Sequence, residues 1–192
     1  MRTYGWLRIL ALLAAGILAG AGAVIAGVEV NRHTSTDAFC SSCHSMSGLA
    51  NDPHYLGSAH RSNAAGVKPS CGDCHIPKTN WFVETYTHIV SGTRDVIAEF
   101  TNNFDNPNIW EARRVALAHE VRDIMRRQGS VTCRSCHIPD SIQPVSERGQ
   151  AAHTLLREGR MTCIDCHFNL VHAPVLPTTA FIRGSGLAAP AK

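Results

Sequence analysis

Cys40-Ser41-Ser42-Cys43-His44-Ser45-Met46 decides the architecture of this chain, because its first five residues form a C-x-x-C-H motif that occurs four times. The other copies are Cys71-Gly72-Asp73-Cys74-His75, Cys133-Arg134-Ser135-Cys136-His137 and Cys163-Ile164-Asp165-Cys166-His167. C-x-x-C-H is typical of haem c attachment, in which both thiols form thioethers and the histidine reaches the iron. All eight cysteines lie in these motifs. The pattern therefore predicts four covalently bound haem c groups.

Zinc sites and disulfide frameworks also use paired cysteines, and both leave part of this pattern unexplained. Two C-x-x-C pairs can hold one tetrahedral zinc ion, and an even number of cysteines outside the cytoplasm is typical of disulfides. Neither arrangement needs a histidine directly after each second cysteine, which this chain has in all four copies. We therefore favour haem attachment over both.

The composition indicates a small domain rich in cofactors. The chain has 192 residues, a charged fraction of 17% and a net charge of +3, and no basic run is interleaved with aromatics, so we expect no nucleic-acid partner. Its 44% hydrophobic content is concentrated in the first 30 residues. The remainder has few large apolar residues with which to build a core. Four porphyrins would supply the missing apolar surface.

Residues 9–28, from Ile9 to Val28, carry no charge and predict a single transmembrane anchor in the lipid bilayer. About twenty helical residues cross the roughly 30 Å hydrocarbon core. A cleaved signal peptide is the alternative, with Ala21-Gly22-Ala23 as a small-residue site. The apolar run continues past that site and exceeds the roughly 7–15 residues of a signal-peptide core, which favours an anchor.

Positive charge before the anchor sets its predicted orientation. Arg2 and Arg8 lie in residues 1–8, which places this segment in the cytoplasm. Bacterial haem c is attached outside the cytoplasmic membrane, which requires the same orientation. We therefore expect an inner-membrane protein with a periplasmic haem domain over residues 29–175 and a flexible tail over residues 176–192.

The haem domain is predicted to be mainly α with extensive loops, because no strand pattern persists. Helices are expected over 81–91, ending at Gly92, over 109–128, capped by Asn108, and over 146–158, capped by Ser146. Residues 33–38 are expected to form a short polar link, and residues 51–70 a loop. The first cysteines of successive motifs lie 31, 62 and 30 residues apart, which suggests a duplicated two-haem unit.

The histidines exceed what the motifs need. His44, His75, His137 and His167 can each fill one axial position of an iron. Seven remain, namely His33, His54, His60, His88, His119, His153 and His172. This surplus could supply bis-histidine ligation, which closes the iron to substrates and suits electron transfer. Any one of the seven could instead be a surface residue or the partner of a propionate.

Several stretches together resemble one known family. They are residues 39–46, 64–68, 74–78 and 162–167, with His172 beyond, all preceded by the anchor. The chain resembles the NapC/NirT/NrfH family of membrane-anchored tetrahaem quinol dehydrogenases, and the NapC branch in particular. The likeness extends from the anchor to about Pro174.

The resemblance implies a ligand set. Met46 would ligate haem 1 in place of His44, which remains the alternative ligand. His172 would be the distal ligand of haem 2, His60 that of haem 3 and His153 that of haem 4.

The resemblance also implies a function. The protein would oxidise menaquinol or ubiquinol from the membrane pool and pass the electrons to a periplasmic terminal reductase, with nitrate reductase as the first candidate. Asp95 would lie beside haem 1 at the quinol site. His88 falls where the family has a lysine, so it is either a quinol ligand or an ordinary histidine. A homodimer is compatible with the family.

Two other functions remain open from the sequence. One is a terminal haem reductase acting on nitrite or a similar small molecule. The other is a non-enzymatic electron conduit.

Overall fold

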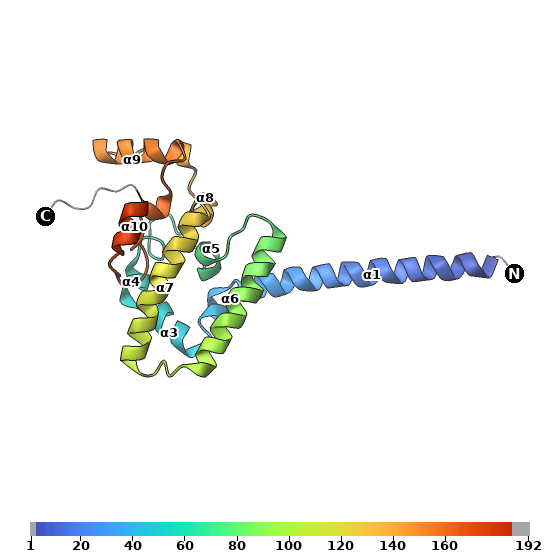
Figure 1. Cartoon of the computed structure of the whole chain (residues 1–192). Helices are drawn as coiled ribbons and strands as arrows, with labels where there is room; N and C mark the ends of the chain where they lie inside the picture. The colour runs from blue at the N-terminus through green and yellow to red at the C-terminus, as the bar shows by residue number, and fades with distance from the viewer. Residues whose placement is uncertain (1–2, 186–192) are drawn as a thin grey trace.

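The computed structural model describes residues 3–185, and these are helical with no strands, so the predicted mainly α class is confirmed. The helices that make up the haem domain are mostly short and joined by loops (Figure 1). In chain order the elements are α1 Thr3–Thr34, α2 Asp37–Cys40, α3 His44–Ala50, α4 Pro53–Gly57, α5 Cys71–His75, α6 Trp81–Thr101, α7 Pro107–Arg127, α8 Val131–Arg134, η1 Pro139–Ser141, α9 Glu147–Arg157, η2 Cys163–Asp165 and α10 Thr179–Gly184.

Helix α1 contains the predicted anchor and extends beyond it. Residues 5–34 are long and apolar enough to cross a membrane, and none of their most apolar window is buried. The helix projects away from the rest of the molecule (Figure 1). Because α1 continues to Thr34 and α2 begins at Asp37, the predicted polar link over 33–38 is reduced to two residues between helices.

Helix α6 packs against the last turns of α1 in a regular register. Trp81 lies beside Gly27, where an added Cβ would come within 3.3 Å of the indole ring. One turn further along both helices, the Asn31 side-chain amide donates to Thr85 Oγ1 at 3.1 Å. The contact positions advance together along both helices, so the angle between their chain directions is less than 90°.

The predicted end of this helix at Gly92 is wrong, because α6 continues through Gly92 to Thr101. Glycine lowers helix stability by about 1 kcal/mol but does not forbid it. Beyond Gly92 the helix gains a long-range contact, since Glu99 accepts hydrogen bonds from Ser45 N–H at 2.9 Å and Ser45 Oγ at 2.5 Å. Tertiary contact therefore overrides the local stop signal.

The two other predicted helices form close to their expected positions. Helix α9 is capped by Ser146, whose Oγ accepts from Gly149 N–H at 3.1 Å. Helix α7 begins earlier than predicted: Asn106, not Asn108, is the cap, and Pro107 occupies the first turn. Proline suits that position because its missing N–H would have no partner inside the helix.

Arginines of α7 contact the segment that runs from the fourth motif to α10. Arg126 Nε donates to Asp165 Oδ1 at 2.5 Å, and its guanidinium lies 3.7 Å from the Phe181 ring centroid. Arg122 is buried and donates to Val175 O at 2.8 Å. These contacts fasten the fourth motif and the segment after it to α7.

Part of the predicted flexible tail over 176–192 is helical in the structure. Helix α10 occupies Thr179–Gly184, and Phe181 within it is 4% exposed. Stacking of Arg126 on Phe181 explains why this Pro- and Ala-rich stretch is fixed. Residues 186–192 lie outside the described part, as do residues 1 and 2 of the predicted cytoplasmic segment.

The apolar core is small, as the composition predicts. Between residues 3 and 185 the buried hydrophobic residues are Tyr55, Leu156, Ile164, Val175 and Phe181. Buried polar groups accompany them: Ser130 is fully buried, and its Oγ accepts from Ile164 N–H at 3.1 Å. Hydrogen bonds and ion pairs therefore hold much of this domain together.

We predict that Asp165→Asn destabilises the haem domain strongly. Asp165 is nearly fully buried beside Arg126, and removing one partner of a buried ion pair costs about 3–5 kcal/mol. Lys78→Ala is the matched control, because it breaks an exposed pair with Asp73 and should cost less than about 1 kcal/mol. Denaturant unfolding of the detergent-solubilised protein, followed by the haem absorption band, measures both. Equal losses in the two variants would contradict the structural role of Asp165.

Candidate haem and quinol sites

The second and fourth motifs are built in the same way. In each, the aspartate at the third position forms a capping box with the residue before the first cysteine: Asp73 with Ser70, and Asp165 with Thr162. Each carboxylate also pairs with a cation, Lys78 in the one case and Arg126 in the other. The same short sequence pattern therefore winds both motifs into a compact turn.

The first and third motifs share a different detail. Their third residues are serines, and each hydroxyl donates to the backbone carbonyl three residues earlier. Ser42 Oγ bonds Phe39 O at 2.6 Å, and Ser135 Oγ bonds Thr132 O at 2.6 Å. The alternation of serine and aspartate motifs matches the duplication of a two-haem unit that the spacing suggests.

Cysteines of neighbouring motifs approach each other in pairs. Hydrogen bonding between the thiols lowers the pKa of Cys40 to about 7 and raises that of Cys71. The same interaction lowers the pKa of Cys163 to about 6 and raises that of Cys133. The attachment points for haems 1 and 2 are thus adjacent, and so are those for haems 3 and 4.

Three spare histidines face three motif histidines across the domain. The pairs and their ring-centroid distances are His75 with His172 at 6.1 Å, His60 with His137 at 6.1 Å, and His153 with His167 at 6.2 Å. Each pair joins a motif histidine to the histidine that the family resemblance assigns to the same haem. Chain separations of up to 97 residues, between His75 and His172, are bridged in this way.

The geometry of these pairs fits axial ligation. Two metal–imidazole bonds of about 2 Å on opposite sides of one ion place the ring centroids about 6 Å apart. His153 Nδ1 lies 2.8 Å from Gly149 O. A carbonyl can only accept, so Nδ1 carries the proton and Nε2 keeps a free lone pair, which is the arrangement of a metal-bound histidine.

The protonation states of three paired histidines also fit. Desolvation by the surrounding protein, and then the neighbouring His172, lowers the pKa of His75 to about 4, although part of its surface remains accessible. Desolvation likewise lowers the pKa of His167 and of His172. These imidazoles are neutral at neutral pH, as metal ligands must be. His172 Nδ1 is buried with no partner in the described part of the chain.

The first motif departs from the other three. His137 N–H and His167 N–H each donate to the carbonyl of the first cysteine of their own motif, at 2.9 Å in both cases. In the first motif the backbone at Cys43 is extended instead, with ψ of 145°, and a new helix, α3, begins at His44. The first motif therefore does not close into the turn that positions its histidine.

His44 and Met46 consequently lie in different surroundings. The His44 side chain is 76% exposed and lies 3.4 Å from Asp105. Met46 sits in the first turns of α3, held beside α6 by the contact of Ser45 with Glu99. The structure thus places His44 beside a surface carboxylate, and Met46 lies two residues further along α3, partly exposed.

Asp95 and His88 share one face of α6, separated by two helical turns. Asp95 keeps exposed surface, yet nearby protein removes enough water that desolvation raises its pKa, against the attraction of Arg94 and Arg113. His88 Nδ1 lies 3.1 Å from Glu84 O, and Nε2 lies 3.2 Å from Ser35 Oγ, whose one hydroxyl hydrogen is donated to Asn31 O at 2.8 Å. His88 is therefore tied to the end of α1.

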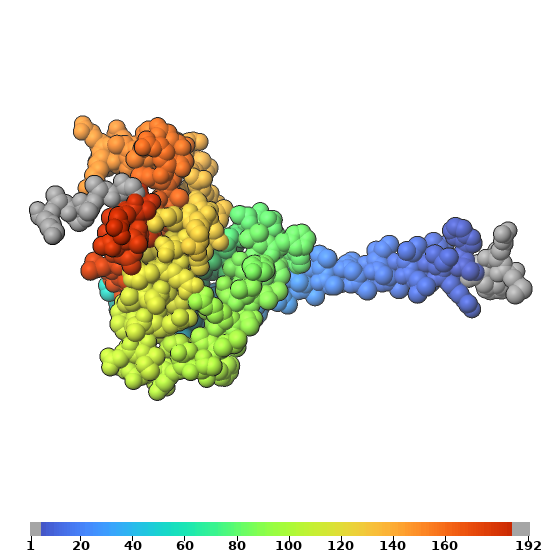
Figure 2. Space-filling model, viewed as in Figure 1, coloured from blue at the N-terminus to red at the C-terminus, as the bar shows by residue number. Residues whose placement is uncertain are grey.

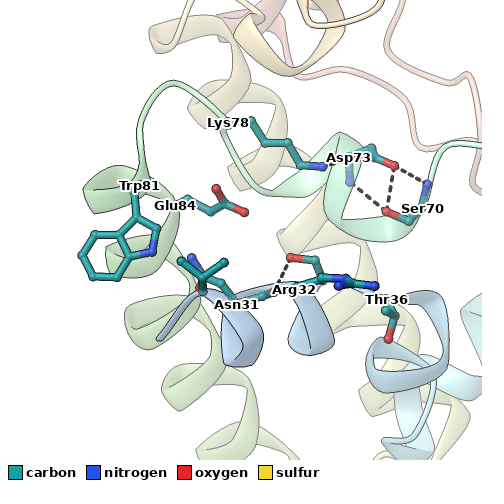
Figure 3. Close-up of a pocket in the computed structure, with 10 residues that line it drawn as sticks. Asn31, Arg32, Thr36, Ser70, Asp73, Lys78, Trp81 and Glu84 are labelled. Carbon is teal, nitrogen blue, oxygen red and sulfur yellow. Dashed lines mark hydrogen bonds and ion pairs between the residues drawn. The ribbon is translucent and has the colours of Figure 1, made fainter. Parts of the chain in front are cut away.

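Two hollows lie near these residues. One, of about 420 Å³, lies where α1, α5 and α6 meet, and Arg32, Asp73, Lys78, Trp81 and Glu84 are among its lining residues (Figure 3). The other, of about 440 Å³, lies on α6 and is lined by Ile89, Val90, Thr93, Arg94 and Ile97. Neither is lined by His88 or Asp95. The α6 hollow is mostly apolar and lies on the same helix as both.

Sequence reasoning missed the residues that position the motifs. Asp37 accepts from Cys71 N–H at 2.8 Å and from Arg61 at 2.7 Å, so it joins the first two motifs. The signal for Asp165 was present, because threonine three residues before an aspartate is a capping pattern. Asp37 and Glu99 lie in no motif, and no local pattern predicts their contacts with Cys71 and Ser45.

The three histidines left without a role stand apart from the pairs. His33 packs edge-on against Phe39, with ring centroids 5.8 Å apart, and His54 lies 3.2 Å from Asp52. His119 Nδ1 is buried with no hydrogen-bond partner among the described residues.

Comparison with known proteins matches this arrangement to a family. The model of the NapC/NirT cytochrome c family, N-terminal region, matches residues 3–177. The chain belongs to the NapC/NirT cytochrome c family. Membership explains the four motifs: the cysteine pairs attach haem c covalently, as in the tetrahaem relatives. No solved structure matches the chain.

Individual relatives of this NapC/NirT chain differ in how far they match. A probable tetraheme cytochrome c-type protein of Nitrosomonas europaea is 36% identical over 73% of this chain and 59% of its own length. Cytochrome c-type protein TorY of Haemophilus influenzae is 36% identical over 80% of this chain and 41% of its own. The chain thus spans about half the length of these curated relatives. Cytochrome c-type protein NapC of Haemophilus influenzae is 31% identical over 89% of this chain and 87% of its own length.

We predict that Met46→Ala changes the absorption spectrum and reduction potential of one haem, whereas His44→Ala leaves both nearly unchanged. The axial ligand sets the potential of a haem, and His44 faces Asp105 instead. Met161→Ala, next to the fourth motif, is the control for loss of a methionine. Spectroscopic redox titration of the purified protein makes the comparison. A larger change in His44→Ala would restore the motif histidine as the ligand.

Proposed function

We propose that this protein is a membrane-bound tetrahaem quinol dehydrogenase, which oxidises menaquinol or ubiquinol and delivers the electrons to a periplasmic terminal reductase. The observation that carries the proposal is the direct packing of the anchor helix against α6, which also carries Asp95 and holds the first motif. A quinol stays within the membrane, so its oxidation requires a redox centre at the membrane surface. The first motif, which begins at Cys40, is connected to the anchor by the fewest residues and meets this requirement.

The ligand set that we propose combines the three histidine pairs with Met46. The pairs would hold haems 2, 3 and 4, and their spacing near 6 Å supports this assignment. Bound haem supplies one-electron chemistry at a potential set by its axial ligands. Successive motifs lie side by side in the fold, so the haem attachment sites follow one another in space in the same order as in the chain.

The order of the motifs in space follows the chain. Cys40 lies beside Cys71, and Cys133 beside Cys163. Between these pairs, the charge of Cys136 raises the pKa of Cys74, after desolvation, so the second and third motifs are also neighbours. An unbroken series of attachment sites supports electron transfer from the membrane end of the domain to the end carrying α9.

Proton removal is the part of quinol oxidation that side chains must perform. Asp95 is our candidate base, and desolvation raises its pKa above that of an ordinary carboxyl, which makes it a better proton acceptor. His88 Nε2 lies 3.2 Å from Ser35 Oγ and could exchange this contact for a quinol hydroxyl.

The membrane arrangement that we propose places residues 1–8 in the cytoplasm and the haem domain in the periplasm. Nitrate reductase is the first candidate for the electron acceptor. The match to NapC supports it, since that relative and this chain align over most of both lengths. The relative named denitrification system component NirT, of Stutzerimonas stutzeri, is 31% identical over 72% of this chain, so reductases of denitrification are the next candidates.

We predict that Asp95→Asn slows quinol oxidation roughly 100-fold, the contribution of a positioned general base, without changing haem content. Wild-type activity should fall as the pH drops through the raised pKa of Asp95, because a protonated carboxyl cannot accept a proton. The variant should lose this acid limb. Asp123→Asn, an exposed aspartate of α7, is the control.

The measurement is haem reduction by a quinol analogue in proteoliposomes, with and without purified candidate reductases. Wild-type turnover in Asp95→Asn would remove that residue from the mechanism. A wild-type protein that no quinol reduces would refute the dehydrogenase and leave an electron conduit. Consumption of nitrite by the purified protein with a chemical donor would indicate a terminal reductase instead.

A further inference from the structure

Helix α6 exposes an apolar stripe that no other helix of the haem domain matches. The stripe consists of Phe82, Tyr86, Ile89, Val90, Ile97 and Phe100, which recur at helical spacing and are all exposed. Phe82, Tyr86 and Phe100 are 76%, 69% and 87% exposed. Soluble surfaces rarely carry a continuous apolar patch of this kind without a partner.

Helix α7 provides an internal comparison, since α6 and α7 both have 21 residues. Ile109 is the only large hydrophobic residue that α7 exposes. Elsewhere its outer surface is polar and carries Glu111, Asp123 and Arg127. The two helices lie in the same domain and differ in what faces outward, so the apolar stripe is particular to α6.

The stripe is not the side by which α6 packs on the protein. Thr85 and His88 contact the end of α1, and Glu99 contacts Ser45 of α3. On a helical wheel, the centre of the stripe lies about 120° away from the centre of these contact residues. The stripe therefore belongs to a separate, unpartnered face of the helix.

The position of this face relative to the anchor identifies its partner. Helix α6 lies on the side of the domain from which α1 leaves, and it crosses the direction of α1 steeply (Figures 1 and 2). Trp81, at the start of α6, contacts Gly27 within the apolar run of α1. Val28 and Val30 of α1 are exposed nearby. The apolar surface of the anchor thus continues onto α6.

We propose that α6 is an interfacial helix that lies on the lipid bilayer beside the anchor, with its apolar stripe immersed at the boundary between headgroups and acyl chains. Amphipathic helices bury an apolar face about 5–10 Å into this boundary. Trp81 and Tyr86 have the amphipathic rings that are enriched at such interfaces. This proposal requires only that α1 is in a membrane, and it holds whatever the redox function of the domain.

The test is photolabelling from within the bilayer. The haem-loaded full chain is placed in liposomes of phosphatidylethanolamine and phosphatidylglycerol containing a phospholipid with a diazirine on its acyl chain. After illumination, tryptic peptides are analysed by mass spectrometry. We expect label on the α1 peptide 9–32 and on the two α6 peptides, 79–94 and 95–113.

An internal control is provided by exposed apolar residues far from the anchor. Peptide 135–148 contains Ile138 and Val145, which are as exposed as the stripe residues, and it should stay unlabelled. The double variant Phe82→Glu, Phe100→Glu should lose the α6 label and keep the α1 label. Val145→Glu should change neither. Both variants alter only exposed side chains, so the fold should be retained.

Three results would overturn the proposal. One is label on α1 with none on either α6 peptide. Another is α6 label no stronger than that of peptide 135–148. The third is absence of lipid label from the stripe together with chemical cross-links between α6 helices of two copies, which would assign the stripe to a homodimer.

Discussion

The buried ion pair between Asp165 and Arg126 joins the fourth haem motif to α7. The carboxylate of Asp165 caps the turn of the fourth haem motif, accepts from Thr162 N–H at 2.7 Å and pairs with Arg126 of α7. Arg126 in turn fixes α10 through Phe181. The domain buries few apolar residues, so this buried ion pair fixes the relative positions of elements that a hydrophobic core would normally hold together. Its net benefit is in geometry: it holds the fourth haem motif against α7.

The local structure of the four motifs repeats in the way that the duplication suggested by their spacing requires. Serine motifs alternate with aspartate motifs, and each aspartate has its own cation, Lys78 or Arg126. The two halves have nevertheless diverged in burial. Asp73 and Lys78 remain partly exposed, whereas Asp165 is almost completely buried. The half nearer the membrane is thus held by weaker electrostatic contacts and compensates through its attachment to α1 and α6.

Sequence alone predicted the anchor, the haem attachment and the helical class, because each depends on residues close together in the chain. It also predicted α9 with its Ser146 cap, and most of α7. It failed where distant residues decide the outcome. Glu99 carries α6 past Gly92, and Arg126 orders α10, and neither partner can be found by local pattern. The pairing of His75 with His172 came only through resemblance to a family, since no spacing rule connects residues so far apart.

The register between α1 and α6 has a mechanical consequence. Helix α1 continues without a break to Thr34, and its side chains engage α6 at Gly27, Asn31 and Ser35. A flexible linker would let the domain tumble above the membrane at a distance set by chain length. Here the anchor acts as a rigid shaft, and each added residue in its last turns would rotate the domain by about 100°. The length of α1 and the register of its contacts with α6 therefore set both the distance of the first haem motif from the bilayer and its rotation about the helix axis.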